Sequence, residues 1–292
     1  MEVDVENEIG KKILNRLQEH DQKEEQFPRF IEMYRELLSI QQEAKSSTKI
    51  KKPSLTKNLV RDRLYEGVPL LSIDDLHLDW DHLQIVFEQV AQWAAKDTEG
   101  SPGEIEVLRN IARNGSLLRE SVSTWYQGRS LATIAAVQGV DVELFTSVVS
   151  AALKPFLSVY SRLLLPEVDM ELWLRRYCPV CGGKPDFAFL DKERGARWLL
   201  CSRCDTEWVF QRLMCPYCGN QDQNSLKYFT DDQEVYLYRI YVCESCHRYI
   251  KAIDLRKTES EVLMPLERIM TLDMDRQAQE KGYMPGWPIN ME

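Results

Sequence analysis

The sequence predicts an α+β protein with an N-terminal all-α domain, two tandem four-cysteine ribbon units of β structure, and a C-terminal helix. Two observations support this fold class. All eight cysteines lie between Cys178 and Cys246, in four C-x-x-C pairs. Hydrophobic residues follow helical spacing before this region and alternate with turns after Tyr177. We therefore predict a helical domain at 1–174, a double ribbon at 175–258, and a helix with a tail at 259–292.

Several segments of the first half have apolar residues three and four positions apart, which predicts amphipathic helices. They are KKILNRLQEH (11–20), FPRFIEMYRELLSIQQEA (27–44) and DHLQIVFEQVAQWAAK (81–96). SPGEIEVLRNIAR adds a start signal, because Ser101 is a suitable N-cap, Pro102 suits the first helical position and Glu104 completes a capping box. DVELFTSVVSAALKPFLSVYSRLL predicts a long helix, bent at Pro155 because proline removes one backbone hydrogen bond.

A basic segment interrupts this helical pattern. KSSTKIKKPSLTKNLVRDR, from Lys45 to Arg63, has seven basic residues and one acid. One interpretation is a solvated, mobile linker. The other is a docking surface for an acidic partner segment or a phosphate.

The cysteine region contains an internal duplication. PDFAFL and ARWLLC flank DKERG, and SLKYF and EVYLYRIYVC flank TDD, so both pairs predict β-hairpins. Residues 178–214 and 215–255 each follow the plan C-P-x-C-G, hairpin, C-x-x-C, third strand. The third strands are WVFQRL and YIKAIDL. The stretch MPLERIMTLDMDRQAQEKGY predicts a helix, and MPGWPINME an irregular tail.

The four C-x-x-C pairs predict two metal sites. A tetrahedral ion takes four soft ligands, and each C-x-x-C turn supplies two. Hairpin spacing assigns Cys178, Cys181, Cys201 and Cys204 to the first site, and Cys215, Cys218, Cys243 and Cys246 to the second. Gly182 and Gly219 follow the second cysteine of their pairs, where glycine permits positive φ and brings amide protons towards the sulfurs.

The identity of the metal stays open between zinc and iron, because a four-thiolate tetrahedron accepts both. Zinc would be structural, whereas iron could carry one electron. Four thiolates leave no open position for water, which disfavours hydrolytic metal chemistry. His247 is an alternative ligand, but eight cysteines already fill two sites, so we expect it beside the site or exposed. His20, His77 and His82 have no matching nucleophile or acid partner, and the motifs searched reveal no catalytic constellation.

Composition limits the location and the partners. The N-terminus MEVDVENE is acidic and lacks an apolar export signal, and Lys154 and Pro155 interrupt the most apolar later window, so we expect a cytoplasmic protein without membrane insertion. Net charge is −9, and residues 178–250 hold nine basic and ten acidic residues. This balance disfavours a nucleic-acid surface. The oligomeric state stays open.

Three motifs in this order resemble the formate dehydrogenase accessory proteins, the FdhE family. They are RYCPVCGGKP (Arg176 to Pro185), CSRCDTEW (Cys201 to Trp208) and CESCHRYIK (Cys243 to Lys251). C-x-x-C-x-T-E-W is the most specific of them, and the resemblance is clear over about residues 175–255. It implies rubredoxin-like metal units that hold zinc or iron. It also implies a non-catalytic cytoplasmic factor that assists maturation of molybdenum- or tungsten-dependent formate dehydrogenase, acting on the catalytic subunit before export.

The triplet Thr206, Glu207 and Trp208 directly follows a metal-ligand turn, so we predict that it contacts the client enzyme. The alternative for Trp208 is packing within the small core. Two other function classes stay open: a rubredoxin-like iron redox carrier, and a zinc-ribbon nucleic-acid-binding protein.

Overall fold

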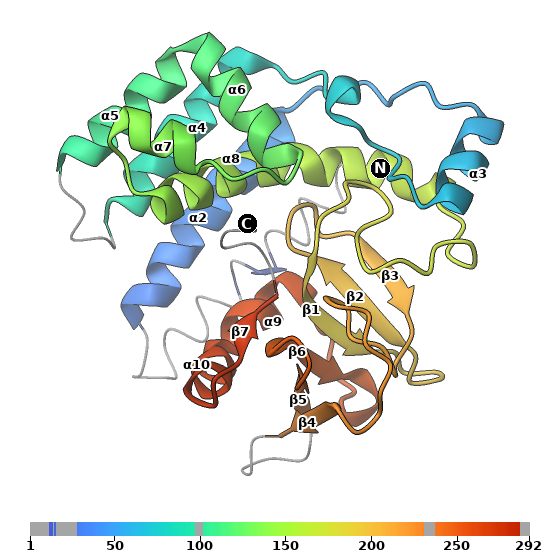
Figure 1. Cartoon of the computed structure of the whole chain (residues 1–292). Helices are drawn as coiled ribbons and strands as arrows, with labels where there is room; N and C mark the ends of the chain where they lie inside the picture. Colours follow the sequence, from blue (N-terminus) through green and yellow to red (C-terminus); the bar gives the residue numbers. More distant parts are fainter. Residues whose placement is uncertain (1–11, 14, 16–27, 97–101, 231–236, 287–292) are drawn as a thin grey trace. The chain divides into compact units, whose positions relative to one another are not determined.

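The computed structural model describes residues 12–13, 15, 28–96, 102–230 and 237–286 (Figure 1). The chain forms two compact units. The helical unit comprises Met1–Lys51, Ile73–Val159 and Ile289–Glu292, and the sheet unit comprises Lys52–Ser72 and Tyr160–Pro288. The predicted boundary at 174 therefore lies inside the sheet unit. This unit also includes the earlier segment Lys52–Ser72. The independent folding of the predicted domains stays a prediction.

The helical unit agrees with the predicted all-α domain. Its helices are α2 (Pro28–Ser47), α4 (Trp80–Ala94), α5 (Pro102–Arg113), α6 (Gly115–Tyr126), α7 (Ala132–Gln138) and most of α8 (Val142–Leu164). The helix predicted over 11–20 lies mostly outside the described residues. Pro102 is the first residue of α5, as predicted. Ser101 lies outside the described residues, and Glu104 accepts a hydrogen bond from the Asp141 amide (3.1 Å).

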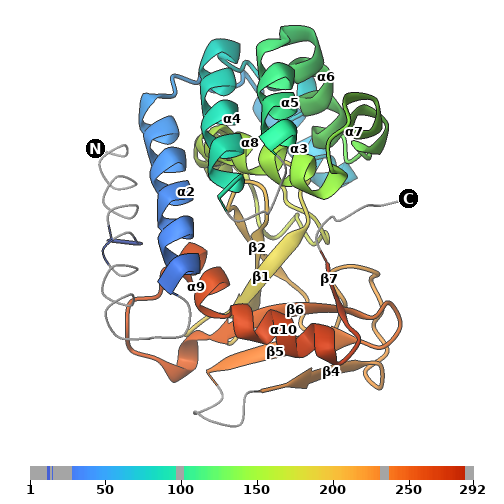
Figure 2. The ribbon, with the colours of Figure 1, turned by 90° about the vertical axis from the view of Figure 1, so that its left-hand side faces the viewer.

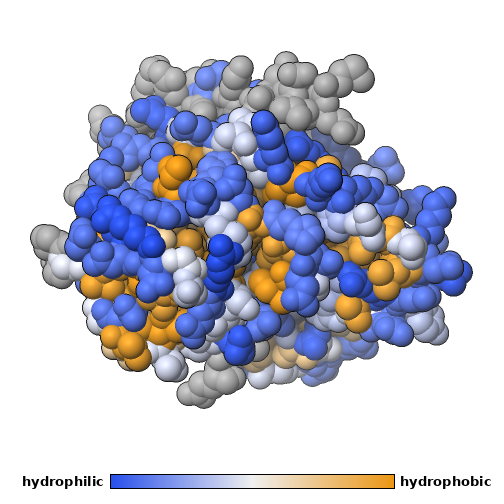
Figure 3. Space-filling view, turned by 90° about the horizontal axis from the view of Figure 1, so that it is seen from above, coloured by the Kyte–Doolittle hydropathy of each residue, from blue (hydrophilic) through white to orange (hydrophobic). Residues whose placement is uncertain are grey.

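Helix α8 continues through Pro155. By length and composition, Val142–Glu167 is the one helix of the described residues that could cross a membrane, but 56% of its most apolar window is buried within the protein. Phe145, Val149, Leu153 and Phe156 are fully buried. Core packing therefore accounts for the apolar sequence. On the face seen in Figure 3, hydrophilic side chains predominate and hydrophobic ones form small groups between them.

The basic segment contains a helix, contrary to the mobile-loop interpretation. Helix α3 (Lys57–Glu66) begins at Thr56, whose side chain accepts a hydrogen bond from the Leu59 amide, and ends at Gly67, which has φ of 79°. Only two residues of this helix are buried, Val60 and Leu64. Its apolar periodicity is therefore weak, although both cap signals are present in the sequence.

The two predicted ribbons join into one sheet. The strands are β1 (Pro185–Leu190), β2 (Arg197–Cys201), β3 (Glu207–Phe210), β4 (Leu226–Phe229), β5 (Tyr238–Cys243), β6 (Arg248–Asp254) and β7 (Met284–Pro285). Their order is β3-β2-β1-β6-β5-β4, and β7 pairs with β6. Both hairpins and both third strands are confirmed. The sequence analysis did not predict the parallel pairing of β1 with β6, which aligns Phe187 with Lys251.

The predicted C-terminal helix is two helices, α9 (Met264–Met270) and α10 (Leu272–Glu280). They break at Thr271, and the buried Lys251 ammonium donates to the carbonyls of Arg268 (3.0 Å) and Thr271 (3.1 Å). Both helices lie along one face of the sheet (Figure 2). Met264 packs with residues of β1, β2 and β6, and Met274 packs with residues of β5 and β6.

Candidate metal centres

Each C-x-x-C pair forms a tight turn closed by the residue that follows its second cysteine. This residue has positive φ in all four turns: Gly182 (71°), Asp205 (59°), Gly219 (80°) and His247 (51°). Its amide donates to the carbonyl of the first cysteine at 3.0, 3.3, 3.0 and 2.8 Å, respectively. Glycine takes this conformation readily, which confirms the prediction for two turns. The other two use aspartate and histidine.

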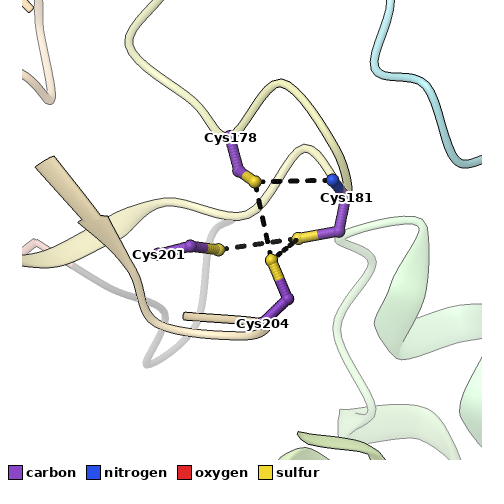
Figure 4. Close-up of side chains that lie close together, drawn as sticks. All are labelled: Cys178, Cys181, Cys201 and Cys204. Carbon is purple, nitrogen blue, oxygen red and sulfur yellow. Dashed lines mark hydrogen bonds between the residues drawn. The ribbon is translucent and has the colours of Figure 1, made fainter. Parts of the chain in front are cut away.

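The first cluster consists of Cys178, Cys181, Cys201 and Cys204, and its four sulfurs converge on one point (Figure 4). The Sγ–Sγ distances are 3.6 Å for Cys178–Cys204, 3.5 Å for Cys181–Cys201 and 3.3 Å for Cys181–Cys204. A tetrahedron with metal–sulfur bonds of about 2.3 Å has edges of about 3.8 Å. The cluster therefore has nearly the size that a zinc or iron ion requires.

Hydrogen bonds in the first cluster are arranged for thiolates. The amides of Val180 and Cys181 donate to Cys178 Sγ at 3.4 and 3.5 Å, and the Arg203 amide donates to Cys201 Sγ at 3.4 Å. Thr206 Oγ1 lies 3.0 Å from Cys204 Sγ. Such donors stabilise negative charge on sulfur and orient metal ligands.

Burial makes the first cluster dependent on a cation. All four cysteines are buried. Burial raises the pKa of Cys178 and of Cys181 well above the usual thiol value. Burial opposes ionisation of Cys204 too, but hydrogen bonds from the neighbouring thiols and from Thr206 bring its pKa well below that value. Four thiolates share this interior only with compensating positive charge, so the donor set fits a bound metal ion.

The second cluster consists of Cys215, Cys218, Cys243 and Cys246 and is more open. The Sγ–Sγ distance is 3.7 Å both for Cys215–Cys246 and for Cys218–Cys243. Cys218 is exposed and Cys246 is partly exposed. Burial raises the pKa of Cys215 to about 11, whereas amide hydrogen bonds from Cys246 and Ser245 outweigh burial and lower the pKa of Cys243 to about 7. The two clusters thus contain the same four residue types, but only the second is exposed to solvent.

His247 lies outside both clusters of candidate ligands. It is exposed, and its ring lies near that of Tyr283, with centroids 6.3 Å apart. Its backbone carbonyl accepts from the Met284 amide at 2.8 Å, which ties β7 to the last turn. His77 is exposed, His82 packs edge-on against Phe156, and His20 lies outside the described residues.

The predicted partner-binding triplet is largely interior. Thr206 and Trp208 are 1% and 0% exposed. Thr206 Oγ1 lies 2.5 Å from Ser161 Oγ, and the Trp208 indole donates to the Arg175 carbonyl at 3.0 Å. Trp208 therefore packs in the core, as its alternative interpretation states, and contact of the triplet with the client stays a prediction. Glu207 is partly exposed, and its pKa is raised by burial and by Asp205.

Arg268 of α9 supports the first cluster, although sequence reasoning did not single it out. Its guanidinium pairs with Asp186 of β1 (2.7 Å) and with Asp205, the residue after ligand Cys204. It also donates to the Cys201 carbonyl at 2.7 Å. No local sequence signal relates these groups, because Arg268 and Asp205 are 63 residues apart.

The segment after α3 borders the first turn of this cluster. The amides of Leu70 and Leu71 donate to the carbonyls of Pro179 and Val180, both at 2.9 Å. The Tyr177 hydroxyl donates to the Gly67 carbonyl at 2.7 Å. This segment is named the strap (residues 67–71). Part of the sequence interpreted as a linker therefore leads into a support for a metal-ligand turn.

The fold and the two clusters define a class: a protein with a helical unit and a double four-cysteine ribbon built for metal ions. The model of the FdhE central domain matches residues 177–212. An FdhE homologue from Aquifex aeolicus (strain VF5) is 30% identical over 240 residues, covering 79% of this chain and 77% of the relative. An FdhE homologue from Shewanella baltica (strain OS185) is 31% identical over 188 residues, covering 61% of this chain and 59% of the relative.

The crystal structure of the FdhE protein from Pseudomonas aeruginosa matches with a TM-score of 0.65 and 20% identity, covering 97% of this chain and 95% of that one. At this identity the match demonstrates the shared fold. The Aquifex aeolicus relative, similar over more than two thirds of both chains, shows the family. The chain belongs to the FdhE family of formate dehydrogenase accessory proteins.

Proposed function

We propose that this protein is a non-catalytic cytoplasmic accessory factor that assists maturation of molybdenum- or tungsten-dependent formate dehydrogenase by binding its catalytic subunit before export. The observation that carries the proposal is that each cluster, in a member of this family, provides a complete set of four sulfur ligands for one metal ion. Each offers four sulfurs around one point, so a bound ion has no open position for a substrate. The sites therefore favour a binding role over hydrolysis.

In this proposal the metal ions fix the sheet unit in a binding-competent form. Each cluster binds one zinc or iron ion through its four cysteines. A structural zinc ion contributes on the order of 10–16 kcal/mol of binding free energy, which becomes folding free energy where the free chain has no preformed site. The ion bound by Cys204 would then fix the chain just before β3. The buried side chains of Thr206 and Trp208 hold the start of this strand against the core.

Within β3, Glu207 is the residue we assign to the client. β3 is an edge strand of the described sheet, and Glu207 is partly exposed on it. A carboxylate on a rigid strand can accept paired hydrogen bonds from an arginine of the catalytic subunit. Thr206 and Trp208 contribute as buried supports of that strand.

One observation favours a second function, that of a rubredoxin-like iron redox carrier. Cys218 is exposed, so an iron ion at the second cluster would lie close to solvent and to a redox partner. Metal analysis combined with an anaerobic absorption spectrum separates the two functions. Zinc in both clusters rejects the redox function. The balance of charge at residues 178–250 disfavours the zinc-ribbon nucleic-acid-binding function.

The test is complementation of cells that lack their own accessory protein. Expression of this chain should restore formate dehydrogenase activity, and a Cys178→Ser/Cys181→Ser variant should not. The cells should contain a cognate formate dehydrogenase and equal levels of each variant. The proposal is rejected if formate dehydrogenase activity is equally low with and without the intact chain.

A further inference from the structure

A cavity of about 200 Å³ lies in the sheet unit beside the second cluster. Residues 212–217, which follow β3 and include Cys215, form one side, and the rest of the lining comes from Arg197 of β2 and from β4, β5 and β6. Tyr241 lies on the sheet face opposite to that of Val242, which packs with Met274 of α10. The cavity is larger than one of about 150 Å³ that accepts benzene. It therefore has room for an aromatic ring.

Five of the residues that line this cavity are cationic. They are Arg197, Arg212, Lys227, Arg239 and Arg248, and the lining includes no aspartate or glutamate. Lys227 pairs with Glu244 at 3.1 Å and Arg239 pairs with Asp254 at 2.9 Å. The other three have no carboxylate partner among the residues that the structure describes. A divalent ion held by four thiolates carries a net charge of −2, which leaves at least one of these three charges unbalanced.

Arg197 provides a second, independent sign of a ligand. Arg197 is only 3% exposed, yet its Nε atom has no hydrogen-bond partner within the described part of the chain. Its terminal nitrogen donates to the carbonyls of Gln211 and Met214, so the guanidinium is held in place. Arg239 Nε, in the same lining, is also buried and unpaired. Buried donors without partners are costly, and an anion in the cavity would satisfy them.

The remaining wall is aromatic and apolar. Tyr228 and Tyr241 are cross-strand neighbours on β4 and β5, and their rings are tilted by 51° with centroids 5.9 Å apart. Tyr228 and Leu213 are both 58% exposed and lie in the lining, so the cavity opens to solvent beside them. Tyrosine faces bind planar rings by stacking.

We propose that this cavity binds an aromatic phosphate of the size of a nucleoside monophosphate. The phosphate pairs with the guanidinium groups of Arg197, Arg212 and Arg248, and the aromatic ring packs against Tyr228 and Tyr241. Three guanidinium groups without carboxylate partners favour a dianionic phosphate over a monoanionic carboxylate. The proposal does not depend on the client of the protein.

The test is titration of the metal-loaded full-length chain with AMP, adenosine and inorganic phosphate, followed by calorimetry or ligand-observed NMR. AMP should bind about tenfold or more tightly than either fragment, because it uses both the charge-assisted hydrogen bonds and the aromatic wall. Equal affinity for adenosine and AMP overturns the proposal, since the cationic wall would then contribute nothing. If AMP does not bind at millimolar concentration, the proposal is also overturned. This holds even if an acidic peptide or a single-stranded oligonucleotide binds instead.

Matched arginine variants locate the site. Arg212→Gln and Arg248→Gln should each weaken AMP binding by about fivefold to tenfold while metal content is unchanged. Arg194→Gln is the control, because Arg194 is exposed in the β1–β2 turn and is not part of the lining. Tyr228→Ser should weaken binding, and Tyr228→Phe should retain it. Affinities equal to that of the Arg194 control in both arginine variants reject the site.

Discussion

At the scale of single residues, a change at Glu207 tests recognition of the client separately from folding. Glu207→Gln keeps the shape of the side chain and removes its charge, so metal content and melting temperature should stay near those of the parent while formate dehydrogenase maturation falls. Glu193→Gln, in the exposed β1–β2 turn, is the matched control. Trp208→Ala should lower both stability and maturation, because truncating a fully buried indole costs about 3–5 kcal/mol. If a folded Glu207→Gln variant supports full maturation of formate dehydrogenase, the carboxylate of Glu207 has no role in recognising the client.

Arg268 is the residue whose loss should loosen the first cluster. Its side chain is 12% exposed and pairs with two carboxylates. Arg268→Gln removes the guanidinium from both ion pairs, which should cost about 3–5 kcal/mol, the range for breaking a buried ion pair. Chemical denaturation and the rate of metal release measure the effect. Arg276→Gln, at a side chain 70% exposed, should change neither, and equal behaviour of the two variants would contradict the assigned role.

At the scale of elements, the two clusters should differ in metal exchange. All four cysteines of the first cluster are buried, whereas Cys218 of the second is exposed and Cys246 is partly exposed. A chelator should therefore remove the second ion first, with rates that differ by about tenfold or more, equivalent to about 1.4 kcal/mol in barrier height. Variants with Cys178→Ser/Cys181→Ser or Cys215→Ser/Cys218→Ser assign the two phases. Release in the opposite order would show that exposure does not govern exchange.

The first ribbon should also depend on its ion for structure. Cys178→Ser/Cys181→Ser should lower metal content by about one ion per chain and make residues 178–214 sensitive to protease, because a short β unit buries too little apolar surface to fold alone. Glu193→Gln, in the exposed β1–β2 turn of the same ribbon and outside the cysteine cluster, is the control. Unchanged protease resistance with metal lost would mean that the ion does not hold this ribbon together.

The elements also show how far the sequence predicts the structure. The hairpins and ligand turns follow from local signals: alternation, glycines and the C-x-x-C spacing. The β1–β6 pairing does not, because no turn connects these parallel strands and fixes their register. Contacts between Arg268 and Asp205, and between the strap and Pro179, join distant segments, so no local pattern indicates them. The sequence analysis did not predict α3, because the charged residues of this segment obscured its weak helical pattern.

At the scale of the whole molecule, we propose a protein that binds its client in a metal-dependent way and does not act as a catalyst. The most direct measurement is titration of the purified, metal-loaded chain with purified formate dehydrogenase catalytic subunit after nuclease treatment, with the Cys178→Ser/Cys181→Ser variant as the control. We expect saturable binding by the intact chain that nuclease does not alter, and binding at least tenfold weaker by the variant, a loss of about 1.4 kcal/mol or more. No binding to a catalytic subunit that is competent for maturation would contradict the proposal.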